Sequence, residues 1–134
     1  MNMNYFIIAL ITLIPLAVLD SVWLGIMRGW YQTKLSHLFA QNVVWLPIVL
    51  FYVMYALALA YFVVSPAYAF GWPTGRVFLT GAFIGLIAYG TYDFTNHATL
   101  RDWPTIVTLV DMAWGIFISG AASVVAVLLV KLFS

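Results

Sequence analysis

The sequence predicts an all-α membrane protein: a single domain (1–134) built as a compact bundle of four transmembrane helices. Hydrophobic residues make up 66% of the chain and charged residues only 7%, whereas a soluble domain carries about 25% charged residues. The mean hydropathy is +1.08. Four apolar runs reach the length of about 20 residues that a helix needs to cross a hydrocarbon core of about 30 Å. These runs are 4–26, 43–64, 76–97 and 104–130.

The first run and the segment after it predict a spanning helix followed by a short surface helix. The chain begins without Lys or Arg before the first run, which is also long for a signal peptide, so we expect this run to remain as a transmembrane helix. In the following segment (27–42), Tyr31, Leu35 and Leu38 recur at helical intervals. This spacing predicts a short interfacial helix between the first two spans. Pro15 and Pro47 lie within spans, where we expect kinks.

The third and fourth spans each follow the tripeptide Trp-Pro-Thr, at 72–74 and 103–105. Proline suits the first turn of a helix and tryptophan suits the membrane interface, so both tripeptides predict helix starts. By the same preference we interpret most of the tryptophans as residues of the interfacial aromatic belt: Trp23, Trp30, Trp45, Trp72 and Trp103.

A stripe of residues in the third span recurs at every fourth position. It consists of Gly81, Gly85, Tyr89, Asp93 and His97. The small members let a neighbouring helix approach closely, and they direct Asp93 toward protein rather than lipid. The fourth span offers a matching face of Asp111, Gly115, Ser119 and Ala122. We therefore expect these two faces to pack together.

Three aspartates are predicted to gather near one membrane face. Successive spans alternate in direction, so the end of the first, the end of the third and the start of the fourth meet the same face, opposite both termini. Asp20, Asp93 and Asp111 occupy these positions, and Asp102 lies in the connection at that face. An Asp at a helix centre costs about 2.5–3.5 kcal/mol on insertion scales, so these residues need partners, protons or water.

Two of the aspartates share a local motif. "LDSVWLG" (19–25) and "VDMAWG" (110–115) both place Trp three residues after Asp. Because the first and fourth spans are antiparallel, we expect Trp23 to point toward the surface and Trp114 to lie deeper. A duplication of helix pairs is therefore not supported.

Several motifs resemble one family. "LDSVWLG", "SPAYAF", "AYGTYDFTNHATL", "DWP" and "VDMAWG" are similar to the bacterial membrane-protein family named domain of unknown function 2177 (DUF2177), over nearly the whole chain. The resemblance implies a small four-helix integral membrane protein, and hence a bacterial inner membrane location. It also implies that Asp20, Asp93, Asn96, Thr99 and Asp111 belong to the family's signature, without implying an activity.

The candidate site residues follow from the acids and their surroundings. The acids are the candidates for general acid/base work, for holding a cation, or for structural hydrogen bonds within the bundle: Asp20, Asp93 and Asp111. Candidate ligand-binding residues are these three with Trp23, Tyr89, Asn96, His97, Thr99 and Trp114. Asp93, His97 and Asp111 could also ligate a divalent metal, but without a multi-histidine motif a metal site is not favoured. No particular cofactor is indicated.

Composition and motifs exclude several function classes. Without cysteine there is no disulfide or thiolate chemistry, and a net charge of +1 provides no footprint for nucleic acid. There is no Gly-rich phosphate loop and no GxSxG motif. The membrane face with the aspartates has only one more Lys or Arg near the spans than the opposite face has. The rule that basic residues stay in the cytoplasm therefore only slightly favours a cytoplasmic position for the aspartates.

Three function classes stay open. The protein binds or modifies a lipid or other apolar small molecule, or it is a small homo-oligomeric transporter coupled to protons or cations, or it is a structural accessory subunit without chemistry. We favour the first class, because the acids lie near one surface, whereas transporters place their sites near the middle of the bilayer.

Overall fold

The computed structural model describes residues 3–134, and these form helices joined by short connections, without a strand. The elements are α1 (Tyr5–Leu35), α2 (Trp45–Leu59), a π-helical segment η1 (Ala60–Val64), α3 (Ser65–Phe70), α4 (Thr74–Thr99) and α5 (Thr105–Phe133). Because α2, η1 and α3 form one continuous helix, Trp45–Phe70, the described residues contain four helices long and apolar enough to cross a membrane. The predicted fold class is confirmed.

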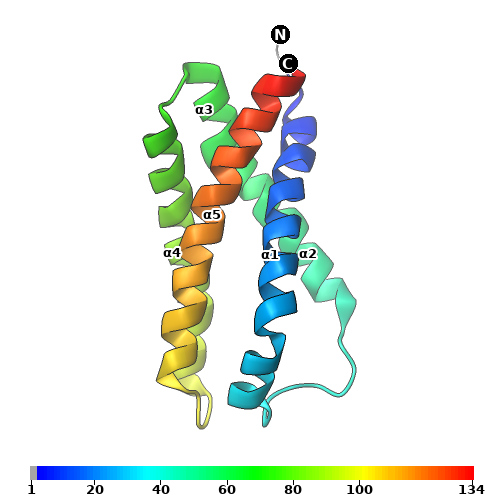
Figure 1. Ribbon diagram of the computed structural model, residues 1–134, viewed down its shortest axis with the longest axis vertical. Helices are drawn as coiled ribbons and strands as arrows, with labels where there is room; N and C mark the ends of the chain where they lie inside the picture. Colours follow the sequence, from blue (N-terminus) through cyan, green and yellow to red (C-terminus); the bar gives the residue numbers. More distant parts are fainter. Residues whose placement is uncertain (1–2) are drawn as a thin grey trace.

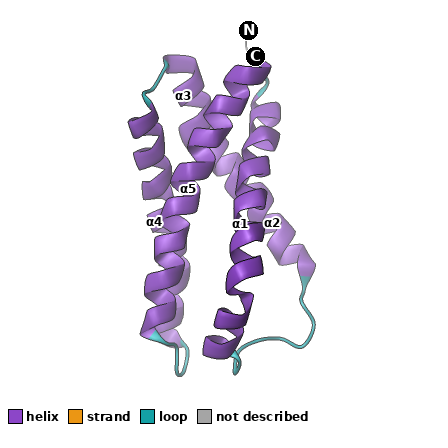
Figure 2. Ribbon diagram, viewed as in Figure 1, coloured by secondary structure: helices purple, strands orange, loops and turns teal. Residues whose placement is uncertain are grey.

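The four helices run alternately up and down. Both termini lie at one end of the bundle, and the connections 36–44 and 100–104 lie at the other (Figures 1 and 2). We call the end with the connections 36–44 and 100–104 the acid end. The ends of α1 and α4 and the start of α5 meet there. Asp93 and Asp111 lie about two helical turns from this end, whereas Asp20 is the sixteenth of the 31 residues of α1 and lies at the middle of that helix. The similar depth predicted for the three aspartates therefore holds for two of them, because α1 continues beyond the predicted end of its span.

The first helix is longer than the sequence pattern suggested, and this removes the expected interfacial helix. Residues 27–35 continue α1, and residues 36–44 form turns and loop rather than helix. A helix of 31 residues is about 46 Å long at 1.5 Å per residue. It therefore exceeds a hydrocarbon core of about 30 Å, so its last turns extend toward or past the interface. As a result, Tyr31 follows Trp23 by about two turns along the same helix.

The two Trp-Pro-Thr segments do start helices. Pro73 and Pro104 each immediately precede the first helical residue, one position earlier than expected, and their carbonyls accept from the amides of Val77 and Val107 at 3.1 Å each. Before α4 the chain reverses at Gly71, whose φ of 65° lies in the left-handed region that glycine adopts without steric cost.

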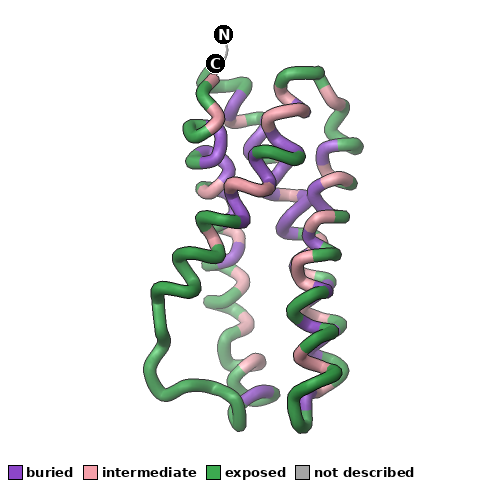
Figure 3. The backbone as a smooth tube through the Cα atoms, turned by 180° about the vertical axis from the view of Figure 1, so that it is seen from behind, coloured by how far each residue is buried: buried purple, intermediate pink, exposed green. Residues whose placement is uncertain are grey.

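Burial is concentrated in the half of the bundle that holds the termini (Figure 3). There α1, the continuous helix of α2, η1 and α3, α4 and α5 enclose a core of fully buried aliphatic side chains, including Leu59, Val63, Ile118 and Val130. Toward the acid end the first half of α2 diverges from the other helices and its side chains are mostly exposed (Figure 1). In a bilayer these exposed apolar side chains face lipid.

The most extensive packing in the bundle joins α4 and α5, and it uses the small residues of the predicted stripe. A Cβ added at Gly85 would lie 2.4 Å from the Gly115 carbonyl oxygen, and one added at Gly81 would lie 2.6 Å from Ser123 Oγ. A Cβ at Gly115 would meet the ring of Tyr89 at 2.1 Å. The two helices therefore approach as closely as the sequence pattern predicted.

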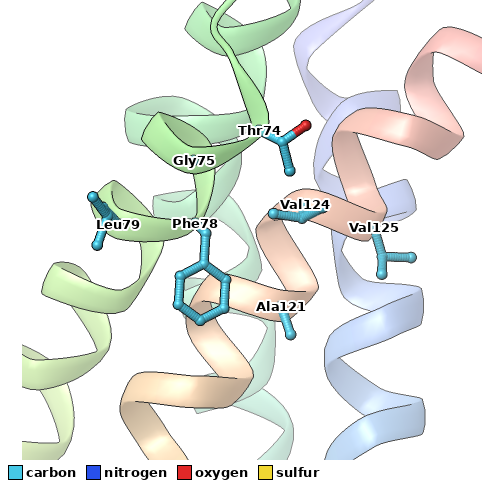
Figure 4. Close-up of a pocket in the computed structure, with 7 residues that line it drawn as sticks. All are labelled: Thr74, Gly75, Phe78, Leu79, Ala121, Val124 and Val125. Carbon is cyan, nitrogen blue, oxygen red and sulfur yellow. The ribbon is translucent and has the colours of Figure 1, made fainter.

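An apolar groove runs along the outside of the same helix pair, near the end that holds the termini. Its volume is about 520 Å³, and it is lined by Thr74, Gly75, Phe78, Leu79, Ala121, Val124 and Val125 (Figure 4). None of the candidate site residues lines it. Its apolar lining is typical of a surface that contacts lipid acyl chains.

Candidate functional site

Asp20 is a buried carboxylate that ties three helices together. The indole of Trp114 in α5 donates to its Oδ1 at 3.0 Å, and the hydroxyl of Tyr52 in α2 donates to its Oδ2. Both oxygens of Asp20 thus have a donor, each from a different helix. This carboxyl is a structural junction of α1, α2 and α5.

Asp111 receives its donor from the extended end of α1. The Tyr31 hydroxyl donates to Asp111 Oδ1 at 2.8 Å, and the Trp23 indole donates to the Tyr31 oxygen at 3.2 Å. Trp23 also stacks on Trp114, with ring centroids 4.4 Å apart and an interplanar angle of 5°. The two tryptophans therefore form a flat double layer between α1 and α5, and both their indoles donate within the site.

The two Asp-Trp motifs are paired crosswise. In α1 the chain runs toward the acid end, so Trp23 lies nearer that end than Asp20, and in α5 the order is reversed. Trp114 is consequently level with Asp20, to which it donates, and Trp23 donates through Tyr31 to Asp111. The expected depths of the two tryptophans agree with this arrangement. Their stacking was not expected from the sequence.

Asp93 differs from the other two aspartates because it has no donor. Its side chain is fully buried between α4 and α5, beside the carboxyl of Asp111. Neither of its oxygens has a hydrogen-bond partner among residues 3–134. A buried polar group without a partner is costly, and two carboxylates in contact repel each other. We call Asp93 and Asp111 the carboxyl pair.

Aromatic and amide side chains of α4 border the carboxyl pair. Tyr89 packs its ring on Gly115 and lies near the carboxyls of Asp20 and Asp111. Tyr92, one turn before Asn96, contacts that amide and lies near both members of the pair. Asp111 is half-buried, like Trp23, Tyr31 and Trp114, whereas Asp93 is fully buried.

The structure does not bring His97 and Thr99 to the carboxyl pair. The His97 ring lies against the hydroxyls of Thr105 and Thr108, at 3.4 Å from Nε2 and 3.1 Å from Nδ1 respectively. The Thr99 hydroxyl donates to the Thr95 carbonyl of its own helix at 2.7 Å. His97 thus connects the end of α4 to the start of α5.

A metal centre finds no support in the described part of the chain. Among residues 3–134, no group of three or more His, Asp or Glu side chains is placed to hold a metal ion. In particular, Asp93, His97 and Asp111, the weak candidates from the sequence, are not gathered into such a group.

Two tyrosines that donate to the aspartates are absent from the candidate residues predicted from the sequence. Tyr31 was assigned to an interfacial helix, although the spacing of Asp20, Trp23, Met27 and Tyr31 along one helical face would have shown that it continues the same surface. Nothing in the local sequence marks Tyr52 as the donor to Asp20. Its role follows from the crossing of α2 against α1.

Two tryptophans depart from the expected aromatic belt. Trp103 is 7% exposed and packs with Leu35 and Val107 at the acid end. Its indole donates to the Thr108 hydroxyl at 3.0 Å. Trp23 is half-buried in the stack with Trp114. Trp45, by contrast, is 68% exposed, as a belt residue would be.

Comparison with known proteins supports the resemblance noted from the motifs. No curated protein and no solved structure matches the chain. Residues 5–128 match a family described as a predicted membrane protein, DUF2177. The match extends over all four spanning helices and includes every residue of the site. The chain therefore belongs to the predicted membrane protein family DUF2177.

Proposed function

We propose that this protein binds an amphiphilic molecule of the membrane, whose polar end meets the carboxyl pair and whose apolar part lies toward the lipid. The observation that carries the proposal is Asp93, which is fully buried and has no partner for either oxygen among residues 3–134. Ionisable side chains inside membranes are expensive and by default mark functional sites. A ligand at this position would supply the missing partner.

The position of the carboxyl pair suits an amphiphile. Asp111 is the seventh residue of α5, and Asp93 lies six residues before the end of α4. Both are therefore about two helical turns from the acid end, near the level of lipid head groups. The half-buried aromatic residues Trp23, Tyr31 and Trp114 provide flat apolar walls beside the polar pair, as in small-molecule sites.

The cellular setting that fits this proposal is a bacterial inner membrane. The motifs resemble a bacterial family, and spanning helices are typical of inner membranes, whereas outer-membrane proteins span as closed barrels. The membrane lipid around the bundle is then the natural source of the ligand.

The carboxyl pair also favours a second function, coupled transport of a proton or cation. Two apposed carboxyls can hold one exchangeable positive charge between them. In a single copy, however, the half of the bundle with the termini is filled by aliphatic side chains such as Leu59 and Ile118. A path across the membrane would require a homo-oligomer, so we place this function second.

The test compares Asp93→Asn with Asp102→Asn. Asp102 is exposed in the connection between α4 and α5, so it serves as a matched control outside the site. Each protein is purified in mild detergent, its melting is measured, and co-purifying small molecules are extracted and identified by mass spectrometry. We expect a bound amphiphile with the wild type and with Asp102→Asn, and its loss from an Asp93→Asn variant that melts nearly as the wild type does.

Two results would overturn the proposal. One is an Asp93→Asn variant that retains the same bound molecule. The other is an Asp93→Asn variant that unfolds, because the carboxyl would then serve the fold.

A further inference from the structure

Resting on the proposed function, we infer that the amphiphile bound at the carboxyl pair is a cation whose head group is a protonated amine bearing N–H donors. The inference joins three features of the site: two apposed carboxyls, two unpaired acceptor oxygens on one of them, and aromatic side chains around them. Each feature narrows the chemistry of the head group.

The apposed carboxyls select the sign of the charge. Asp93 and Asp111 lie side by side, and Asp20 also lies within electrostatic reach of Asp111. A phosphate or carboxylate head group would add a further negative charge at low dielectric and be repelled. The basic residues of this half, Arg28, Lys34 and Arg101, are all exposed. Two apposed carboxyls either hold a proton between them or neutralise a cation, and an ammonium head group supplies that cation.

The acceptors of Asp93 select a hydrogen-bond donor. Asp20 already accepts from Trp114 and Tyr52, and Asp111 accepts from Tyr31. Asp93 alone keeps both oxygens free of partners among residues 3–134. An ammonium group with two or three N–H bonds can satisfy both oxygens of one carboxylate, whereas a quaternary ammonium has no hydrogen to donate.

The surrounding side chains favour an organic cation over a metal ion. Calcium takes six to eight oxygen ligands, and no metal-binding group of three acids or histidines occurs among the described residues. The site offers instead the stacked indoles of Trp23 and Trp114 and the ring of Tyr31. Aromatic faces stabilise a desolvated ammonium through cation–π attraction and contact its carbon atoms well.

The alkyl part of such a ligand has apolar surface to lie on. Ile26 of α1 follows Trp23 by three residues and so shares its helical face, and it is 74% exposed. This side chain already faces lipid in a membrane, so an alkyl chain leaving the site along it would remain in a hydrocarbon environment.

The experiment measures binding of four probes with the same twelve-carbon chain to the purified full-length protein by calorimetry in mild detergent. The probes are dodecylamine, dodecyltrimethylammonium, dodecanol and dodecanoate. We compare the wild type with Asp93→Asn, Asp111→Asn and the control Asp102→Asn. Partitioning of a probe into micelles is the same with every variant, so a difference between variants reports binding to the protein. Melting curves establish that each variant is folded.

For the wild type and for Asp102→Asn, we expect the affinity for dodecylamine to be at least about tenfold higher than the affinity for each of the other three probes. A charge-assisted hydrogen bond contributes enough binding free energy to give a ratio of this size. Asp93→Asn and Asp111→Asn should each lose that advantage. Asp111→Asn repeats the comparison at the second carboxyl of the pair, and an Asp93→Asn variant that does not fold would overturn the proposed function and this inference with it.

The outcomes separate this inference from the proposed function. Dodecanol or dodecanoate binding as tightly as dodecylamine, with loss in Asp93→Asn, would overturn the amine while leaving an amphiphile site in place. Equal binding of dodecyltrimethylammonium and dodecylamine would overturn the role of N–H donors. Binding of all probes that is unchanged in Asp93→Asn and Asp111→Asn would overturn both proposals.

Discussion

Asp20, Asp111 and Asp93 are chemically identical side chains in three different surroundings. Asp20 has a donor on each oxygen, Asp111 has Tyr31 on one oxygen, and Asp93 has no partner among residues 3–134. The same substitution therefore has a different physical meaning at each position. Removing a carboxylate disturbs the fold where donors converge on it, and under the proposed function it disturbs binding where none do.

Asp20→Asn should destabilise the protein, by about 1 kcal/mol. The Trp114 indole can only donate, so it keeps the one acceptor oxygen of asparagine, and the N–H₂ group then faces Tyr52, whose hydroxyl must accept instead of donate. Thermal unfolding in detergent measures the change, with Asp93→Asn as the comparison. An Asp20→Asn variant that melts no lower than Asp93→Asn would show that Asp20 is not the structural junction described above.

Tyr31→Phe should weaken the attachment of the end of α1 to α5. The change removes the hydrogen bond to Asp111 and the acceptor of the Trp23 indole. Hydrogen bonds between membrane helices contribute about 0.6 kcal/mol on average and up to about 1.7 kcal/mol, so we expect a loss of about 1 kcal/mol in unfolding free energy. Tyr61→Phe, at a position 64% exposed in η1, is the matched control. Equal stability of the two variants would argue against the Tyr31 bridge.

At the scale of elements, the pairing of α4 with α5 positions the carboxyl pair. Glycines at 81, 85 and 115 bring the two helices into near backbone contact, and Asp93 and Asp111 extend that same interface toward the acid end. Position 115 must stay small because the Tyr89 ring packs against it, and positions 81 and 85 must stay small because atoms of α5 lie against them. Close packing thus fixes the separation of the two carboxyls.

Gly115→Ala should therefore lower stability, whereas Gly25→Ala should not. The new methyl group at 115 would lie 2.1 Å from the Tyr89 ring, and relieving this overlap costs about 1–3 kcal/mol. At Gly25 no atom lies within 4 Å of the added methyl group. There the greater helix propensity of alanine should raise stability by up to about 1 kcal/mol. Melting curves that rank the two variants in the opposite order would contradict the α4–α5 contact.

At the scale of the whole molecule, the alternation of four spans places the connections 36–44 and 100–104 on one side and both termini on the other (Figure 1). The carboxyl pair lies about two turns from one end of the bundle, and the half at the other end is filled by the aliphatic core. This arrangement suits the proposed binding of an amphiphile from one leaflet.

The topology predicts which sides of the membrane single cysteines reach. The chain contains no cysteine, so Ser36→Cys, Arg101→Cys and Ser134→Cys each introduce a single thiol at an exposed position. In sealed vesicles, a membrane-impermeant maleimide should label positions 36 and 101 from the same side and position 134 from the other. Labelling of 36 and 134 from one side would overturn the four-span arrangement and the gathering of the acids that depends on it.

Much of this arrangement is determined by local properties of the sequence. Hydropathy over about 20 residues predicts each span, and counting spans places Asp93 and Asp111 near one face. Asp20 was predicted at the same depth but lies at the middle of α1. The four-residue spacing from Gly81 to Asp93 predicts the face of α4 that packs on α5. The positions of helix ends were predicted less accurately. The length needed to cross the bilayer ends the first span at residue 26, whereas α1 continues to Leu35. A helix continues as long as its residues permit, regardless of membrane thickness.

Only the tertiary structure decided which polar groups meet. Trp114 donates to Asp20 rather than within its own motif, Tyr52 reaches the same carboxyl from α2, and Asp93 is left without a donor among the described residues. These contacts join residues up to 94 positions apart in the chain. They depend on how each helix is rotated and tilted against its neighbours, which is set by packing of the whole bundle. A periodic sequence indicates which face turns inward, but hydrogen-bond partners are selected over distances of about 3 Å, where small rotations of a helix decide.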